Sequence, residues 1–484
     1  MKCVLSILLL IAILASTMAC GGTQADGDTS ANGDSSSESS SPDSETELSD
    51  DLPEVNYDGR EFNIIARTNF AYEFDAEQTG DIMDDAIYTR NMAVEERFGV
   101  KLITHPYDDG NGNASNVIPM IEQSVMAGDD AYQLGAAYTF FAAPASLSGS
   151  FANIYDVKRI NLDKPWWEKG FTEEATINGK VYIATGDISL LFNEVTMSVF
   201  FNKQLADDLK LGDIYKTVKD GKWTFELMKK WCADAASDLN GDGKMDENDR
   251  FGIGVNRYTH VDCFIYAFNV PLTERDANGI PQLKINNEKM ISLVKQLTAL
   301  FHDSDTAYLS DNGANAFGDN MFESGQGLFM TSWLGNAAAL RDMTMDFGII
   351  PYPKWDEAQE AYSTYYLDRA SCMVIPVTAD YEFVGTIVEA LAAESSKKVI
   401  PAFYDVTLKG KSVRDDESKE MIDLIRSGVR YDFANIYAYA FGYNNPGQIL
   451  RALVWDNDTN FASFYSKNET TYLSKLSELL DKFQ

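Results

Sequence analysis

Runs of apolar and polar residues divide the chain into short strands and amphipathic helices. Residues 61–66 form an apolar, β-prone stretch, and residues 84–98 follow with Ile87, Val94 and Phe98 on one helical stripe. A second β-prone stretch begins two residues after this helix. Helical periodicity between two short β-prone runs predicts a strand–helix–strand unit, the unit from which parallel sheets are built.

Similar units recur further along the chain. Residues 117–127 have the pattern of a helix, and residues 132–138 that of a strand. Asn178 and Gly179 form a hairpin signal, and residues 197–201 predict a strand that runs into a helix over residues 204–209. The sequence contains no internal repeat of fixed period. These elements indicate a mixed α/β protein.

The N-terminus has the build of an export signal. Lys2 precedes an uncharged, mostly apolar run over residues 4–19, which is shorter than the ~20 residues of a membrane-spanning helix. The run ends at Ala19 before Cys20, which resembles a bacterial lipobox, whose Cys is lipid-modified and becomes the new N-terminus. We therefore expect a signal peptide over 1–19 and an exported protein anchored by Cys20 to the outer face of the cell membrane. Thr17 stands where a lipobox usually has Leu, so ordinary signal cleavage stays open.

An acidic spacer follows Cys20. Residues 21–51 contain nine Asp and Glu residues, no Lys or Arg and almost no large apolar side chain. Such a segment cannot bury enough surface to fold, and its charges repel one another. The sequence predicts a disordered tether over residues 20–56 that holds a folded body away from the membrane.

The charge balance limits the partners of the folded part. The 484 residues carry 74 acidic and 40 basic side chains, a net charge of −34. Without the nine acids of the spacer and Lys2, 65 acidic and 39 basic residues remain, a net charge of −26. This field repels nucleic acid and anionic lipid. Neutral and cationic small ligands stay compatible with it.

Cysteine and histidine offer little for metal or acid–base chemistry. The three cysteines of the folded part are widely spaced in apolar surroundings, which predicts free buried thiols rather than a disulfide framework: Cys232, Cys263 and Cys372. Only three histidines are present in the whole chain: His105, His260 and His302. No phosphate-binding loop and no serine-nucleophile motif is found. The composition favours a binding protein over an enzyme.

Five short segments, in this order, carry a family resemblance: residues 177–185, 199–205, 221–225, 325–330 and 347–353. They resemble the extracellular solute-binding proteins of ABC importers, and more narrowly family 1, the sugar-binding type to which maltose-binding protein belongs. The resemblance covers residues 57–484. It implies a two-lobed periplasmic-binding-protein type II fold, with crossing hinge strands between the lobes and the ligand clamped between them. The implied partners are a sugar or oligosaccharide and the transmembrane subunits of an ABC permease, and we expect a monomer.

The same resemblance implies how the chain divides between the lobes. Lobe 1 would contain residues 57–198 and 355–410, and lobe 2 residues 199–354 and 411–484. The chain would cross between the lobes near residues 198–202, near 354–365 and near Lys411.

Residues 238–249 match a calcium-binding loop. Oxygen-bearing side chains and one main-chain carbonyl fall at loop positions 1, 3, 5, 7, 9 and 12: Asp238, Asn240, Asp242, Lys244 (carbonyl), Asp246 and Asp249. Gly243 at position 6 permits the sharp turn. Position 12 usually carries Glu, and the shorter Asp249 supplies fewer oxygens. We expect a structural Ca²⁺ here, with a metal-free acidic turn as the alternative.

Aromatic residues are the first candidates for a sugar site, because the C–H faces of a sugar pack on rings and its hydroxyls pair with charged or amide groups. Trp333 resembles the position where the family often places a stacking Trp. Trp166 and Trp167 follow Pro165 in an expected loop, and Tyr365 and Tyr443 could add further rings. For any single ring, core packing is the alternative.

Charged candidates lie near strand ends and the expected lobe crossings. Arg67 ends the first strand, and in an open α/β sheet the carboxyl ends of the strands face the ligand. Asp187 and Glu194 precede the first crossing, whereas Asp368 and Arg369 come after the second and could instead form a structural ion pair.

The sequence thus predicts an importer's sugar-binding protein that is not an enzyme. Two rival functions stay open. A different solute, such as a peptide or a polyamine, is compatible with the acidic charge. A secreted glycan-active enzyme would use a carboxylate pair in the cleft, but acids are too abundant in this chain for such a pair to stand out.

Overall fold

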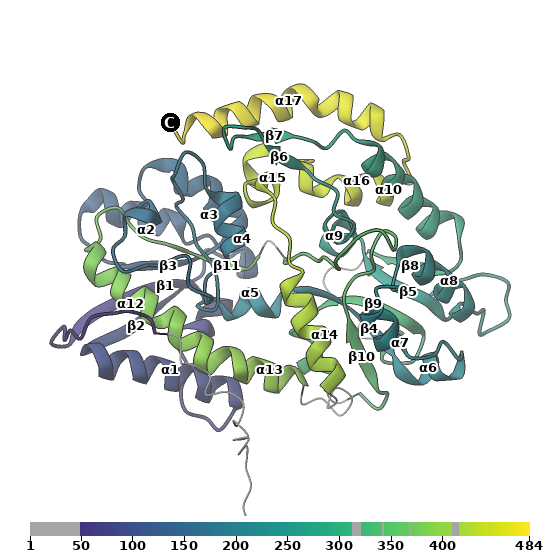
Figure 1. Ribbon diagram of the computed structural model, residues 1–484, viewed down its shortest axis with the longest axis horizontal. Coiled ribbons are helices and arrows are strands. Elements are labelled where there is room, and N and C mark those ends of the chain that lie inside the picture. Colours follow the sequence, from purple (N-terminus) through teal and green to yellow (C-terminus); the bar gives the residue numbers. More distant parts are fainter. Residues whose placement is uncertain (1–48, 312–320, 341–342, 368, 409–415) are drawn as a thin grey trace, which may run out of the picture. The chain divides into compact units, whose positions relative to one another are not determined.

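The computed structural model describes residues 49–311, 321–340, 343–367, 369–408 and 416–484, and Ser49–Gln484 forms one compact unit. Cys20 and most of the acidic spacer lie outside the described residues. The unit contains two main β-sheets with helices packed around them. The first sheet lies at the left of Figure 1 and the second at the right. In the described part of the chain, no helix combines the length and the apolar character needed to span a bilayer.

The first sheet has the strand order β11-β3-β1-β2. Its strands are β1 (Arg60–Arg67), β2 (Val100–Tyr107), β3 (Leu134–Tyr138) and β11 (Ser371–Val374). β1 pairs in parallel with β2 and β3, whereas β11 is antiparallel to β3. Helices α1 (Ile82–Phe98), α2 (Ile118–Ala127), α3 (Thr139–Ala145) and α12 (Tyr381–Glu394) pack around this sheet.

The second sheet has the order β10-β4-β9-β5-β8. Its strands are β4 (Met197–Asn202), β5 (Phe251–Asn256), β8 (Ala307–Ser310), β9 (Gly327–Trp333) and β10 (Phe347–Ile350). β5, β8 and β9 run in parallel, and β4 is antiparallel to β9 and β10. β6 (Thr273–Arg275) and β7 (Pro281–Leu283) form a separate two-stranded ribbon.

Further helices lie around the two sheets and in the segments between them. They are α4 (Lys169–Ala175), α5 (Leu190–Glu194), α6 (Lys203–Asp208), α7 (Ile214–Lys219), α8 (Phe225–Ala235), α9 (Thr259–Ala267), α10 (Glu288–Thr298), α11 (Asn336–Ala339), α13 (Ile400–Leu408), α14 (Asp416–Ser427), α15 (Phe433–Ile436), α16 (Ile449–Trp455) and α17 (Phe461–Asp481). Short 3₁₀ turns include η1 (Thr68–Glu73), η4 (Ile154–Asp156) and η9 (Ala438–Phe441).

Local sequence signals account for the first strand–helix–strand unit. Asp81 caps α1 by accepting hydrogen bonds from the backbone N–H of Met83 and Asp84. Gly99 ends the helix with φ 58°, a left-handed conformation that glycine adopts without strain. The predicted stripe of Ile87, Val94 and Phe98 is buried. The expected parallel pairing of the two flanking strands is confirmed by β1 and β2.

Three segments lie side by side where the chain passes between the sheets. The first leads from α5 into β4, the second from β10 to β11, and the third from α14 to α15. The Met197 N–H donates to the Tyr365 carbonyl at 2.8 Å, and the Thr364 N–H donates to the Gly428 carbonyl at 2.9 Å. The expected third crossing at Lys411 lies outside the described residues, and the lobe boundaries stay a prediction.

The predicted hairpin turn is confirmed in part, and the predicted free thiols are confirmed. Asn178 and Gly179 have φ values of 52° and 71°, as a two-residue hairpin turn requires, but the pairing beyond this turn is a single bridge between Ile177 and Lys180. The three expected free thiols are buried without disulfides: Cys232, Cys263 and Cys372.

Candidate functional site

The first sheet gathers charged and aromatic residues at one edge. The parallel strands β1 and β3 end at Arg67 and Tyr138. Ser371 at the start of the antiparallel β11 pairs with Tyr138, so Arg369, two residues earlier, belongs to the same edge. Ligands of open α/β sheets bind outside the carboxyl ends of the parallel strands.

The second sheet supplies the other side of the site. Its parallel strands β5 and β9 end at Asn256 and Trp333. Met197 at the start of the antiparallel β4 pairs with Trp333, which brings Glu194, three residues before β4, to this edge. The Gly335 N–H donates to the Glu194 carbonyl at 2.9 Å. This hydrogen bond holds Glu194 beside the segment that follows β9.

The two edges meet at Arg369 and Trp333. The Arg369 guanidinium lies over the Trp333 ring, 4.7 Å from its centroid, and the ring stays partly exposed. The His260 ring contacts Trp333 edge to face at 5.9 Å. Burial lowers the pKa of His260 to about 4, so it is neutral. Its Nδ1 lies 3.0 Å from the Thr331 carbonyl and 3.1 Å from the Thr331 hydroxyl.

Glu194 and Tyr72 form a hydrogen-bonded pair beside this contact. The Tyr72 hydroxyl donates to the Glu194 carboxyl. Burial raises the pKa of Glu194 to about 7, while the Tyr72 hydrogen bond and the charge of Arg369 act in the opposite direction. Near neutral pH, Glu194 therefore exchanges between a carboxylate, which only accepts hydrogen bonds, and a protonated carboxyl group, which can also donate one.

Arg67 acts as a support for this edge and not as an exposed ligand contact. Its side chain is fully buried. It donates to the carbonyls of Asn113 at 2.9 Å and Arg369 at 2.8 Å, and to the Ser371 hydroxyl at 3.2 Å. Arg67 was expected at the site, and it lies there as the residue that positions Arg369.

Glu73 is a central residue that sequence reasoning missed. It is completely buried, and burial raises the pKa of its carboxyl. The carboxylate accepts hydrogen bonds from the Ser189 hydroxyl and the Leu191 N–H, both at 2.9 Å, and from the Ser371 hydroxyl at 2.6 Å. Glu73 thereby ties η1 to α5 and β11. Only its place shortly after the first strand could have pointed to it.

Several buried polar groups next to the site have no hydrogen-bond partner among the described residues. They are both side-chain amide atoms of Asn193, the side-chain amide nitrogens of Asn256 and Asn336, and the hydroxyl of Ser332. Buried polar groups in folded proteins are ordinarily paired. Asn193 adjoins Glu194, and Ser332 adjoins Trp333, so this unused hydrogen-bonding capacity lies close to the two converging edges.

Trp166 and Trp167 are not brought to this site. Both indole rings are buried, and their N–H groups donate to the Glu389 carboxyl at 3.0 and 2.9 Å. Glu389 is fully buried, and burial raises its pKa to about 7. Their exposure to a ligand was expected, but they pack instead in the core beside α12. The alternative of core packing holds for both rings.

The other residues predicted to contact the ligand have different surroundings. Tyr365 is buried and stacks on Tyr266 at 4.2 Å. Asp187 is buried and pairs with Arg426 at 3.3 Å. Tyr443 is 93% exposed and points to solvent. Asp368 lies outside the described residues.

The expected calcium loop folds onto its own backbone. The Asp238 carboxylate accepts from the N–H groups of Gly241 and Gly243, and the Asp249 carboxylate from those of Asp246 and Leu239. These backbone hydrogen bonds lower the pKa of Asp249. The donor set is all oxygen, as Ca²⁺ prefers. Within the described ranges, however, no group of three or more His, Cys, Asp or Glu is placed to hold a metal. The calcium site stays a prediction.

Comparison with known proteins identifies the fold. No family model and no curated protein matches the sequence. The ABC substrate-binding protein Lmo0181 from Listeria monocytogenes, solved in complex with cycloalternan, is 13% identical, with a TM-score of 0.52 over 87% of this chain and 98% of that chain. UspC of M. tuberculosis is 12% identical, with a TM-score of 0.53 over 86% of this chain and all of that one. The expected two-lobed fold class is confirmed: the chain has the α/β fold of an ABC substrate-binding protein.

Proposed function

We propose that this chain is the substrate-binding protein of an ABC importer and that it captures a sugar or oligosaccharide between its two sheets. The observation that carries this proposal is the meeting of both sheet edges at Arg369 and Trp333. Residues from each half would contact one ligand there. A ligand that touches both halves stabilises the closed arrangement by its greater affinity for it.

The chemistry of the site suits a neutral, hydroxyl-rich ligand. Trp333 offers a partly exposed ring, and Arg369, Glu194 and Tyr72 offer hydrogen-bonding groups of both kinds. The positive charge of Arg369 faces the Glu194 carboxyl, so the pair favours neither an anion nor a cation. The cycloalternan bound to the similar Listeria protein supports a saccharide.

Capture without bond breaking is the mechanism that these groups support. A glycosidase needs two carboxyl groups that face the scissile bond. Among the described residues, Glu73 is the acid whose charge acts on Glu194, and it is completely buried and accepts three hydrogen bonds from the protein. It is therefore committed to holding η1, α5 and β11 together.

Isothermal calorimetry with an array of neutral mono- to hexasaccharides tests the proposal. We expect binding of at least one saccharide, with the saccharide recovered intact by chromatography. Peptides and polyamines serve as the comparison ligands. Saccharide cleavage would establish the rival enzyme function, and binding confined to peptides or polyamines would establish the rival solute.

The proposal extends to the membrane. Cys20 would carry the lipid, and the folded body would deliver its ligand to the transmembrane subunits of the permease at the outer face of the membrane. The tether was expected to reach residue 56, but residues 49–56 belong to the compact unit, where Asp50 is buried and pairs with Arg97, so the tether would end near residue 48. The signal-like N-terminus and the acidic spacer support this arrangement. The residues from 52 onward, with a net charge of −26, would work as a monomer at a distance from anionic lipid headgroups.

A further inference from the structure

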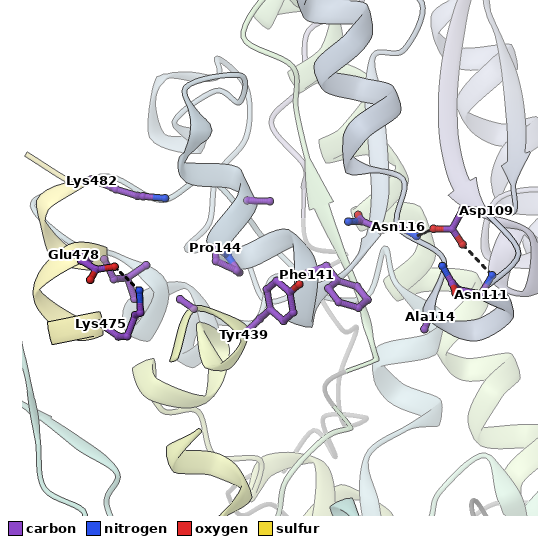
Figure 2. A pocket seen from close by; sticks show the side chains of 13 residues that line it. Asp109, Asn111, Ala114, Asn116, Phe141, Pro144, Tyr439, Lys475, Glu478 and Lys482 are labelled. Atoms are coloured by element: carbon purple, nitrogen blue, oxygen red, sulfur yellow. Dashed lines mark hydrogen bonds and ion pairs between the residues drawn. The ribbon is translucent and has the colours of Figure 1, made fainter. Parts of the chain in front are cut away.

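A cavity lies along α3, the helix that directly follows β3 and Tyr138. It has a volume of about 630 Å³, within the ~300–1,000 Å³ range of pockets that enclose small ligands. One wall is the loop from Asp109 to Asn116, another is α3, and the third comes from η9 and α17. Figure 2 shows Phe141, Pro144 and Tyr439 between the loop and the α17 side chains.

A row of aromatic rings connects the candidate site with this cavity. The Tyr138 ring lies 5.1 Å from the guanidinium of Arg67, at the edge of the first sheet. The Phe141 ring is 5.0 Å from Tyr138, and the Tyr439 ring is 5.1 Å from Phe141. Tyr439 is 52% exposed, so part of its ring is open to a ligand. The row therefore leads from the strand ends to the wall of the cavity.

The polar lining of the cavity is balanced in charge. Lys475 pairs with Glu478 at 2.6 Å, while Lys482 and Asp109 add one charge of each sign. Both carboxylate oxygens of Asp109 accept backbone N–H groups of the loop, from Asn111 and Asn116. The loop is thus held in shape, and its Asn111 and Asn116 line the cavity. Amides, rings and balanced charge suit a neutral ligand with many hydroxyls.

We propose that this cavity is a second saccharide subsite, so that the protein takes a chain of several sugar units rather than a single monosaccharide. One end of the chain would lie at Trp333 and Arg369, and its far units would pack against Tyr439. This inference rests on the proposed function. It adds the length of the saccharide and the residues that distinguish long chains from short ones.

Calorimetry of Tyr439→Ala with the same saccharide array tests the inference. We expect affinity of the wild type to rise with chain length. The variant should bind the longer saccharides about tenfold more weakly and bind monosaccharides unchanged. Tyr439→Phe keeps the ring and should restore the affinity. Tyr155→Ala is the matched control, because Tyr155 is also 52% exposed but lies on η4, away from the cavity.

The outcomes separate this inference from the proposed function. Equal affinity of wild type and Tyr439→Ala for every chain length overturns the subsite and leaves the proposed function in place. An equal loss for monosaccharides and longer chains also overturns it. If no saccharide binds the wild type, both proposals fail. Asn111→Ala alters the opposite wall and should reproduce the length-dependent loss even if Tyr439→Ala does not fold.

Discussion

At the scale of single residues, side chains of the same type have very different surroundings at the candidate site and away from it. Trp333 is partly exposed and touches Arg369, whereas Trp166 and Trp167 are buried around one carboxyl. The same residue type thus offers a partly exposed ring at the candidate site in one place and packs in the core in the other. Arg67 and Arg369 show a similar division, because Arg67 is fully buried and holds the backbone on which Arg369 stands.

Trp333→Ala should weaken saccharide binding by about thirtyfold or more, because a ring at the centre of a binding site typically contributes at least ~2 kcal/mol. The change is measured as the dissociation constant for any saccharide that the wild type binds. Trp355→Ala is the control, since its half-buried ring packs on Phe268 at 5.2 Å. Equal affinities of wild type and Trp333→Ala would remove Trp333 from the site.

At the scale of elements, caps and turns explain why the segments begin and end where they do. Side chains of Asp81, Thr224, Asn287 and Asp380 accept backbone N–H groups at the starts of α1, α8, α10 and α12. The loop from Asp238 to Asp249 uses the same chemistry, with its carboxylates on its own amides. These hydrogen bonds hold the acidic side chains close to the backbone of the loop.

We expect Ca²⁺ to stabilise this loop. An ion at a hundred times its dissociation constant adds about 2.7 kcal/mol to the free energy of unfolding. Differential scanning fluorimetry should show a higher unfolding temperature with Ca²⁺ than with a chelator. Asp246→Asn keeps the hydrogen-bond acceptor for Asn248 but removes a charge, so it should reduce the shift. An identical response of wild type and variant, or none in either, would leave the loop as a metal-free turn.

At the scale of the whole molecule, the chain passes between the two sheets more than once, and the crossing segments pair with one another. The Leu367 N–H donates to the Val195 carbonyl at 3.0 Å, and the Arg430 N–H to the Thr364 carbonyl at 2.9 Å. Hinges between two halves are ordinarily made by a few such connecting segments. This arrangement is compatible with the proposed capture by closure, and the signal-like N-terminus and acidic spacer support the proposed attachment to a membrane.

Replacement of Cys20 by Ser tests the membrane attachment. In a bacterium that processes lipoproteins, we expect the wild type in the membrane fraction and labelled by radioactive palmitate. The variant should be unlabelled and soluble outside the cytoplasm, because the anchor depends on the acyl chains carried by this thiol. Labelling of the variant, or release of both proteins, would contradict lipid anchoring at Cys20.

Local patterns in the sequence were enough to determine the elements and part of the site. The periodicity around Ile87, Val94 and Phe98, with Asp81 and Gly99 at the ends, fixes α1 through interactions within a few residues. Trp333 could be named as a candidate because it resembles the position of the family's stacking Trp. Glu194 and Arg369 could be named because they lie near the lobe crossings that the same resemblance implies. The apolar surroundings of the cysteines likewise predicted buried thiols, which the structure confirms.

The tertiary structure alone decided which candidates meet. Glu389 lies more than 200 positions from Trp166, and their hydrogen bond removes that ring from any ligand. Tyr72 and Glu73 follow the first strand without a motif of their own, and only the approach of α5 and β11 makes them central. Tyr439 reaches Phe141 across a comparable separation. Burial and contact of this kind depend on packing between distant segments, which no local pattern encodes.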